Sequence, residues 1–309
     1  MAALAVRRSI MANIIYLSAT NIEVVCGTRK RDAISVDFHR HIPLEEGALI
    51  NGVIIDEAPI KQHLLTLKGE GINEAVLIID SNKILAKSLS IPKMNHKQIL
   101  AYVQDELSSL YDGDDKLIYD YAYLGDNSEV KGSSRIFAVG IEKSFLENYL
   151  HLFEDVGITL TAVDFSINAL INLTDCLPGL MDESYAITSI NGNNLTSVVF
   201  THGDYALTSR NRIFTTEEDP TSFVTQVTNV MSNLTQFASS AQNNASFKEV
   251  YFTGISKPTS KILFAAIANQ LNLRARFLPD LRNVYASKPG HDELSLNTYL
   301  YTLGYLIGE

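Results

Sequence analysis

Cysteine and charge are scarce in this chain, and long hydrophobic runs are missing. Only two of the 309 residues are cysteines, Cys26 and Cys176. They lie far apart without metal-ligand spacing, which argues against a metal site built on cysteine and favours two reduced core residues. No run approaches the roughly 18 apolar residues of a membrane-spanning helix, so we expect no direct membrane insertion.

Charged residues make up 19% of the chain, a low share for a soluble protein, and their balance is acidic. A net charge of −10 and a pI of about 5.2 argue against a sequence-wide affinity for nucleic acid or anionic lipid. The sequence contains no G-x-S-x-G, Walker A or H-E-x-x-H motif. His39-x-His41 lacks a third ligand and predicts a surface pair, and Asp112 to Asp115 predicts a helix stop, so no metal site is expected.

The first residues do not have the order of a signal peptide. MAALAVRRSI places five small apolar residues before two arginines, the reverse of the usual arrangement. We expect residues 1–12 to form a disordered tail outside the fold. Without a secretory signal the four N-x-S/T sequons carry no meaning, and the sequence predicts a cytoplasmic protein.

The stretch from Ser184 to Phe214 predicts three short strands joined by two tight turns. Asn191-Gly192-Asn193-Asn194 forms the first turn, because Asn and Gly accept positive φ at little cost. A shorter copy of the pattern runs from Tyr16 to Val25. This internal repeat predicts a duplicated chain in which each half begins with a hairpin.

Strands alternate with helices through both halves, which predicts α/β layering in each. In the first half we expect a helix that begins after Asn95, where Gln98 completes a capping box. Pro178-Gly179 predicts the boundary between the halves, and residues 294–307 predict a terminal helix. With 46% hydrophobic residues the chain can bury a core in each half.

A duplicated half that opens on strand–turn–strand is the plan of the actin-like ATPase superfamily. From Met11 onward the chain resembles more particularly the PilM family of type IV pilus assembly. Four segments carry the resemblance: Pro43 to Asp56, similar to P-x-x-G-x-I-x-x-G-x-I-x-D; Lys87 to Met94, similar to a strand–Pro–Met–helix unit; Leu146 to Asp164, similar to L-x-x-A-G-L-x-x-x-A-V-D; and Tyr299 to Ile307, similar to the terminal helix.

The resemblance implies an α/β fold of the actin-like, ribonuclease H-like duplicated type, with an inserted subdomain in the first half. It assigns residues 13–42 and 146–180 to the first actin-like core subdomain. Residues 43–145 form the inserted subdomain, and residues 181–309 form the second half.

Actin-like folds bind ATP through two hairpin turns whose backbone N–H groups hold the phosphates, with an acidic residue that helps to hold Mg²⁺. In a sequence typical of the family, the first turn has the motif D-x-G-S-x-x-x-K. Here Tyr16 replaces the acid, Ser18 replaces the glycine and Glu23 replaces the lysine. In the second turn Ser189 replaces the acid, and the adenosine loop stands as Thr253-Gly254-Ile255-Ser256.

These replacements predict a degenerate nucleotide site without catalytic residues, and no cofactor is expected. ATP with Mg²⁺ is the alternative. The contacts would then come from Ser18, Thr20, Asn191, Gly192, Asn193 and Gly254, which otherwise serve ordinary turns.

The resemblance also implies a partner. PilM-like proteins bind the N-terminal tail of PilN, an inner-membrane protein, in a groove between the first-half core and the inserted subdomain. The chain would then be a scaffold, peripheral at the inner face of the cell membrane, with pilus motor proteins as further partners. The candidate groove residues are Ile34, Val36, Phe38, Leu89, Ile91 and Tyr102; the tyrosine face of Tyr119, Tyr121 and Tyr123 either packs or lines a groove.

Two other functions stay open. An active actin-like ATPase, or a filament former like the division protein FtsA, predicts stabilisation by ATP in a melting experiment. A sugar- or acetate-kinase-like enzyme needs a catalytic acid near the second turn, where Ser189 stands.

Overall fold

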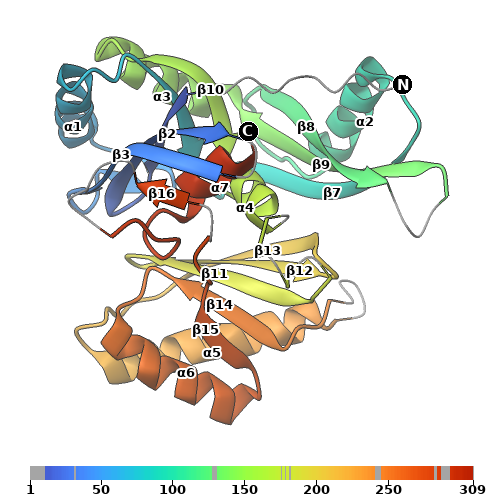
Figure 1. Cartoon of the computed structure of the whole chain (residues 1–309). Coiled ribbons are helices and arrows are strands. Elements are labelled where there is room, and N and C mark those ends of the chain that lie inside the picture. The colour runs from blue at the N-terminus through green and yellow to red at the C-terminus, as the bar shows by residue number, and fades with distance from the viewer. Residues whose placement is uncertain are drawn as a thin grey trace.

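Two β-sheets with helices on their faces form the two halves of the chain, one above the other in Figure 1. The computed structural model describes residues 11–30, 33–126, 131–174, 176–177, 179–180, 182–240, 245–281, 284–286 and 293–308. Within these residues no helix is both long and apolar enough to cross a membrane. Cys26 is buried, as expected of a core cysteine, whereas Cys176 is half-buried, and neither forms a disulfide.

The first half is built on a six-stranded sheet in the order β10-β6-β1-β2-β3-β16. The strands β1, β2 and β3 form an antiparallel meander, while β6 runs parallel to β1, β10 parallel to β6, and β16 parallel to β3. Their bounds are Met11–Leu17 (β1), Asn21–Lys30 (β2), Ala33–Pro43 (β3), Glu74–Ile79 (β6), Thr159–Phe165 (β10) and Val284–Ala286 (β16).

Helices cover both faces of this sheet because side chains alternate along each strand. In β1, Ile15 and Leu17 face a core that contains α1 (Glu57–Gly69) and α3 (Lys143–Asp155). Ile14 and Tyr16 face the opposite core, with α4 (Ser166–Thr174) and α7 (Leu300–Gly308). A short hairpin, β4 (Leu49–Ile50) and β5 (Val53–Ile54), precedes α1.

The second half repeats the plan with a five-stranded sheet in the order β13-β12-β11-β14-β15. Its strands are Tyr185–Asn191 (β11), Asn194–Thr201 (β12), Asp204–Arg212 (β13), Glu249–Thr253 (β14) and Arg274–Phe277 (β15). On one face lie α5 (Pro220–Ala238) and α6 (Lys257–Leu271), which are capped by Asp219 and Ser256. On the other face, Tyr185 and Phe200 join the core that holds α4 and α7, so the two halves share one hydrophobic cluster.

The order β10-β6-β1-β2-β3 in one sheet matches β15-β14-β11-β12-β13 in the other. The predicted duplication, with a hairpin at the start of each half, is therefore confirmed by the topology. Between Asn191 and Asn194 the chain makes the predicted tight turn, with Gly192 at a φ of 55°.

A small subdomain is inserted between β6 and α3. It consists of a three-stranded sheet in the order β7-β9-β8 and the helix α2 (His96–Ser108), which packs on one face. The strands are Ile84–Pro92 (β7), Leu117–Asp126 (β8) and Ser133–Glu142 (β9). Asn95 and Gln98 form the predicted capping box at the start of α2.

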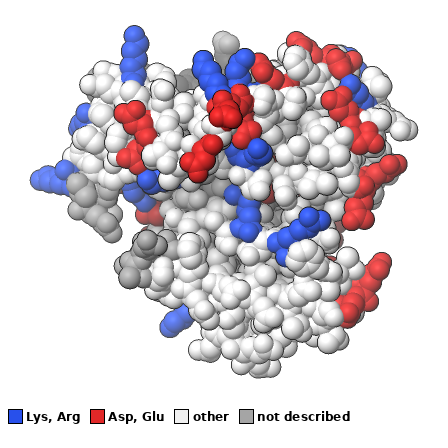
Figure 2. Space-filling view, turned by 180° about the vertical axis from the view of Figure 1, so that it is seen from behind, with Lys and Arg blue, Asp and Glu red and all other residues white. Residues whose placement is uncertain are grey.

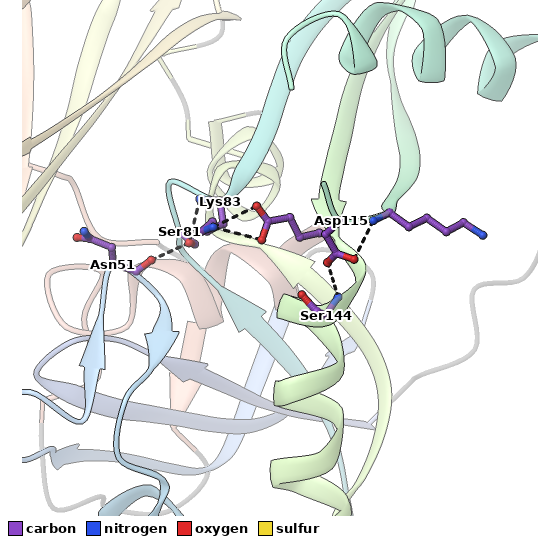
Figure 3. Close-up of polar contacts among 7 residues, drawn as sticks. Asn51, Ser81, Lys83, Asp115 and Ser144 are labelled. Atoms are coloured by element: carbon purple, nitrogen blue, oxygen red, sulfur yellow. Dashed lines mark hydrogen bonds and ion pairs between the residues drawn. The ribbon is translucent and has the colours of Figure 1, made fainter. Parts of the chain in front are cut away.

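Polar side chains fix the base of this subdomain (Figure 3). The hydroxyl of Ser81 donates a hydrogen bond to the carbonyl of Asn51 at 2.7 Å and accepts one from the N–H of Lys83. The ammonium of Lys83 pairs with Glu142 at 3.1 Å, so the start of β7 is tied to the end of β9. Asp115 accepts the N–H of Ser144 at 2.9 Å and thereby joins the start of β8 to the first turn of α3.

The predicted limits differ from the structure at three domain boundaries and at the start of the terminal helix. Residues 1–10 of the expected tail lie outside the described residues, and Met11 and Ala12 already belong to β1. The strand β6 is central in the large sheet, so the inserted subdomain spans β7 to β9 and is shorter than 43–145. The strand β16 and helix α7 pack in the first half, although 181–309 was assigned to the second. The terminal helix begins at Leu300 rather than at 294.

Candidate functional site between the two halves

Two hairpin turns meet in the middle of the molecule. The first joins β1 to β2 and is closed by Ser18, whose N–H and hydroxyl both donate to the carbonyl of Asn21 at 2.9 Å. The second joins β11 to β12. Both turns follow the first strand of their half, so the duplicated topology brings them face to face.

The tips of the turns touch directly. The hydroxyl of Thr20 donates a hydrogen bond to the side-chain oxygen of Asn191 at 2.8 Å. Beside this bond, a Cβ added to Gly192 would lie 2.6 Å from the methyl group of Thr20. The first turn therefore presses against the second where glycine leaves room for it.

On one side of this contact lies a polar cavity of about 190 Å³. Its lining includes an ion pair between Asp80, which follows β6, and Arg210 of β13, with 2.9 Å between Oδ1 and Nη2. Ser166 donates a hydrogen bond to Asp80 Oδ1 at 2.7 Å, and Thr196 donates to Oδ2 at 3.4 Å. The carboxylate of Asp80 is thus engaged by groups from both halves.

On the other side lies a cavity of about 350 Å³, lined by the end of β14, the start of α7 and the first sheet. Glu23 lies on its floor, directly opposite Tyr16 on β1 and His41 on β3. Burial raises the pKa of Glu23 well above its ordinary value, which favours the neutral acid. The N–H of Gly254 donates to Asn297 at 3.2 Å across this cavity.

Tyrosines separate the two cavities. The rings of Tyr16 and Tyr301 lie 4.7 Å apart, and both residues line both cavities. Burial, followed by the neighbouring Tyr301 and Asp80, raises the pKa of the Tyr16 hydroxyl well above its ordinary value. Tyr16 therefore contributes a neutral hydroxyl at the position where a family-like sequence carries an acid.

The six predicted nucleotide-contact residues share this region but do not form one phosphate cradle. Ser18 and Asn191 line the smaller cavity, and Asn191 and Gly254 line the larger one. Thr20 and Gly192 contact each other across the turns. Asn193 lines neither cavity, and its carbonyl accepts the N–H of Ile213 at 2.8 Å.

The two turn tips lie within hydrogen-bonding distance of each other, with no phosphate-sized gap between them. A bridging phosphate needs space between the turns, and the bond from Thr20 to Asn191 occupies it. The acid nearest the turns in the smaller cavity, Asp80, is already paired with Arg210. In the described part of the chain, no three His, Cys, Asp or Glu side chains are grouped so that they could hold a metal ion by themselves; this does not bear on Mg-ATP, whose Mg²⁺ takes most of its ligands from phosphates and water.

The predicted groove residues do not come together. Ile34 and Val36 are buried in the core shared by the halves, and β16 pairs with β3 at these positions. Leu89 and Ile91 are buried under α2 with Tyr102 packed against them. Phe38 packs against the core of α1 and α3, so the six residues belong to three clusters and line no common groove.

A different groove lies between two edge strands, β7 of the inserted subdomain and β13 of the second half. It has a volume of about 420 Å³ and is lined by Ala86 to Ser88 on one side and Ala206 to Thr208 on the other. Each strand is paired along one side only, since β7 and β13 stand at the edges of their sheets. Ile167 and the 53% exposed Phe237 add an apolar lining.

Asp80, Arg210 and Asn297 were missed by reasoning from the sequence. One signal was present: Asp80 directly follows a strand of a parallel pair, and polar groups at the carboxyl ends of such strands often form sites. No local sequence pattern identifies Arg210 as a site residue, because its partner Asp80 lies 130 residues away in the chain.

On the face shown in Figure 2, basic side chains gather near the middle, where the halves meet, while the lower half is largely uncharged.

Compared with known proteins, the sequence matches no family profile and no curated protein. Among solved structures, the chain is similar to one in the "PilM-PilN type IV pilus biogenesis complex", with a TM-score of 0.78 and 15% identity over 97% of this chain and 99% of that one. The cytoplasmic domain of EpsL, an inner-membrane component of the type II secretion system of Vibrio cholerae, gives a TM-score of 0.50 and 11% identity, covering 97% and 96%. A Bacteroides thetaiotaomicron protein with an actin-like ATPase fold and unknown function gives 0.50 and 13%, covering 86% and 90%.

The chain therefore has the actin-like ATPase fold, as the sequence predicted. Within that fold class, its likeness to the PilM-PilN complex spans nearly the full length of both chains.

Proposed function

We propose that this chain is an actin-like scaffold of type IV pilus assembly that binds the N-terminal tail of a PilN-like inner-membrane protein. The observation that carries the proposal is the likeness to the chain from the PilM-PilN complex, which includes the inserted subdomain as well as both halves. The likeness to EpsL, an inner-membrane component of a secretion system, supports a place beside the membrane. The scaffold lies on the cytoplasmic face and reaches the membrane through its partner.

The groove between β7 and β13 suits an extended tail. An extended peptide binds an edge strand through main-chain hydrogen bonds, and alternate side chains enter pockets on either side. Here two edge strands flank one groove, and Ile167, Leu207 and Phe237 offer apolar contacts beside them. The tail therefore takes this groove, in place of the buried residues that the sequence pattern suggested.

The scaffold carries a degenerate nucleotide site. Tyr16 and Ser189 supply hydroxyls where ATP-binding relatives need carboxylates, and Thr20 bonds to Asn191 where phosphates would lie. A role that depends on binding a partner requires no hydrolysis. Pilus motor proteins are further partners of the same scaffold.

Isothermal titration calorimetry tests the proposal with a peptide that covers the N-terminal tail of a PilN-like protein from the same organism. We expect saturable binding at micromolar concentration. Ala206 is exposed in the groove, so Ala206→Arg fills it without disturbing the core and lowers the affinity by about tenfold or more. Ala265→Arg makes the same change on an exposed face of α6 and leaves binding unchanged. An absence of heat at about 100 µM peptide contradicts the proposed partner.

A further inference from the structure

We infer that the two halves hold each other closed through their own side chains, so that the closed arrangement needs no nucleotide. The first link is the hydrogen bond of 2.8 Å from Thr20 to Asn191 at the tips of the two turns. A phosphate that bridged the two turns would have to lie between these side chains, and the direct contact leaves no space for it. The direct bond replaces that bridge with one between protein atoms.

The second link is the ion pair of Asp80 and Arg210 at 2.9 Å, which joins the end of β6 to β13. The two side chains are only 19% and 25% exposed, so water and salt screen the pair less than they screen a surface pair. Thr196 adds a contact from β12 to the same carboxylate. A carboxylate of the first half is therefore held by two strands of the second.

The third and fourth links join other pairs of elements. The N–H of Gly254 donates to Asn297 at 3.2 Å, where the chain returns toward the first half. At the inserted subdomain, Arg135 pairs with Asp204, and the rings of Phe137 and Tyr205 lie 5.2 Å apart. The links are thus spread along the interface, which opposes rotation about any one of them.

These contacts exist only when the halves are closed. A ligand shifts such an equilibrium only by binding the closed form better than the open form. In this chain the protein's own side chains supply that difference, and the shared hydrophobic cluster adds to it. The inference concerns the cleft alone and does not depend on the proposed PilN-like partner.

Hydrogen exchange of the unmodified chain tests this directly. Without nucleotide, we expect the hydrogen-bonded amides of the turns, such as those of Ser18 and Asn21, to be as protected as those of the adjoining strands. Millimolar Mg-ATP should change their exchange rates by less than about twofold, because no site is left for it to fill. Rapid exchange that slows by about tenfold or more when Mg-ATP is added would overturn the inference.

The double variant Thr20→Val with Arg210→Gln removes two links; valine keeps the shape of threonine, and glutamine keeps a polar side chain without the charge. Exchange at both turns should become about tenfold faster, and the radius of gyration from small-angle scattering should rise. Lys261→Gln is the control, because Lys261 is exposed on α6 and lines neither cavity of the cleft. If the double variant exchanges like the original chain, the links do not hold the cleft. If it fails to fold, judged by circular dichroism, the single variant Thr20→Val and the Mg-ATP comparison still decide.

Discussion

Gly304 of α7 lies against the backbone carbonyl of Ala169 in α4, so closely that a Cβ at position 304 would come within 2.5 Å of that oxygen. The absence of a side chain allows the two helices to approach, and their contact closes the core that both halves share. We expect Gly304→Ala to lower the free energy of unfolding by about 1–3 kcal/mol, because the helices must move apart.

Urea denaturation measures this effect, with Gly69→Ala as the control. Gly69 ends α1, and no atom lies within 4 Å of a Cβ built there. Alanine has the higher helix propensity, so this variant should be neutral or more stable by up to about 1 kcal/mol. Equal effects of the two substitutions would contradict a close approach of α4 and α7.

Gly192 combines positive φ with a close neighbour. Its φ is 55°, and its absent Cβ would lie 2.6 Å from the methyl group of Thr20. Gly47→Ala introduces a side chain at a φ of 91° with open space around it, so it measures backbone strain alone, about 1–2 kcal/mol. Gly192→Ala should lose more stability than Gly47→Ala, and Thr20→Ala in the same chain should recover part of the difference. Chemical denaturation of the three variants checks both statements.

Glu23 should make stability depend on pH in an unusual direction for a carboxyl group. Burial raises its pKa in the folded chain above the ordinary value of 4.5, and Tyr16, His41 and Tyr301 are the titratable groups around it. Below that ordinary value Glu23 is protonated in both the folded and the unfolded chain, and its contribution to the free energy of unfolding is complete. This contribution is lost as pH rises toward the folded pKa. Glu23→Gln should therefore raise the melting temperature progressively more between pH 5 and pH 8. The exposed Glu46→Gln serves as control, and parallel curves for Glu23→Gln and the original chain would contradict the prediction.

Asp115 should act in the opposite direction. Its hydrogen bonds to Ser144, and then its bond to the N–H of Lys116, lower its pKa from the ordinary value of 3.8. The folded pKa lies below the unfolded one, so its contribution is present above the ordinary value and disappears as pH falls through the folded pKa. Asp115→Asn should be less stable than the original chain at pH 7, and the difference should shrink as the pH falls below the ordinary value of 3.8. Asp114→Asn, at an exposed neighbouring position, should show no such convergence when urea midpoints are measured from pH 2 to pH 7.

Local signals in the sequence were sufficient for elements whose cause is local. Asn191 and Gly192 specify a tight turn through their own φ preferences, and Asn95 with Gln98 caps α2 through bonds within one helical turn. The duplication could be found for the same reason, since each half begins with the same short-range pattern.

Partners in space could not be inferred in this way. The alternation of Ile34 and Val36 predicted a strand correctly, but it could not show that α7 covers the face on which they lie or that β16 pairs along the edge of β3. The position of β6 in the chain gave no sign that it joins the large sheet rather than the inserted subdomain. The pairing of Asp80 with Arg210 depends on the way the two sheets dock, which no local preference encodes.

The return of β16 and α7 to the first half determines when that half can be finished during synthesis. The strands β1, β2 and β3 leave the ribosome early, yet the strand that completes their sheet is Val284–Ala286, and the helix that covers it is Leu300–Gly308. The second half, by contrast, has all five of its strands once residue 277 has emerged. The part of the chain made first is therefore closed last, and a shortened product without its final residues keeps a complete second half beside an unfinished first one.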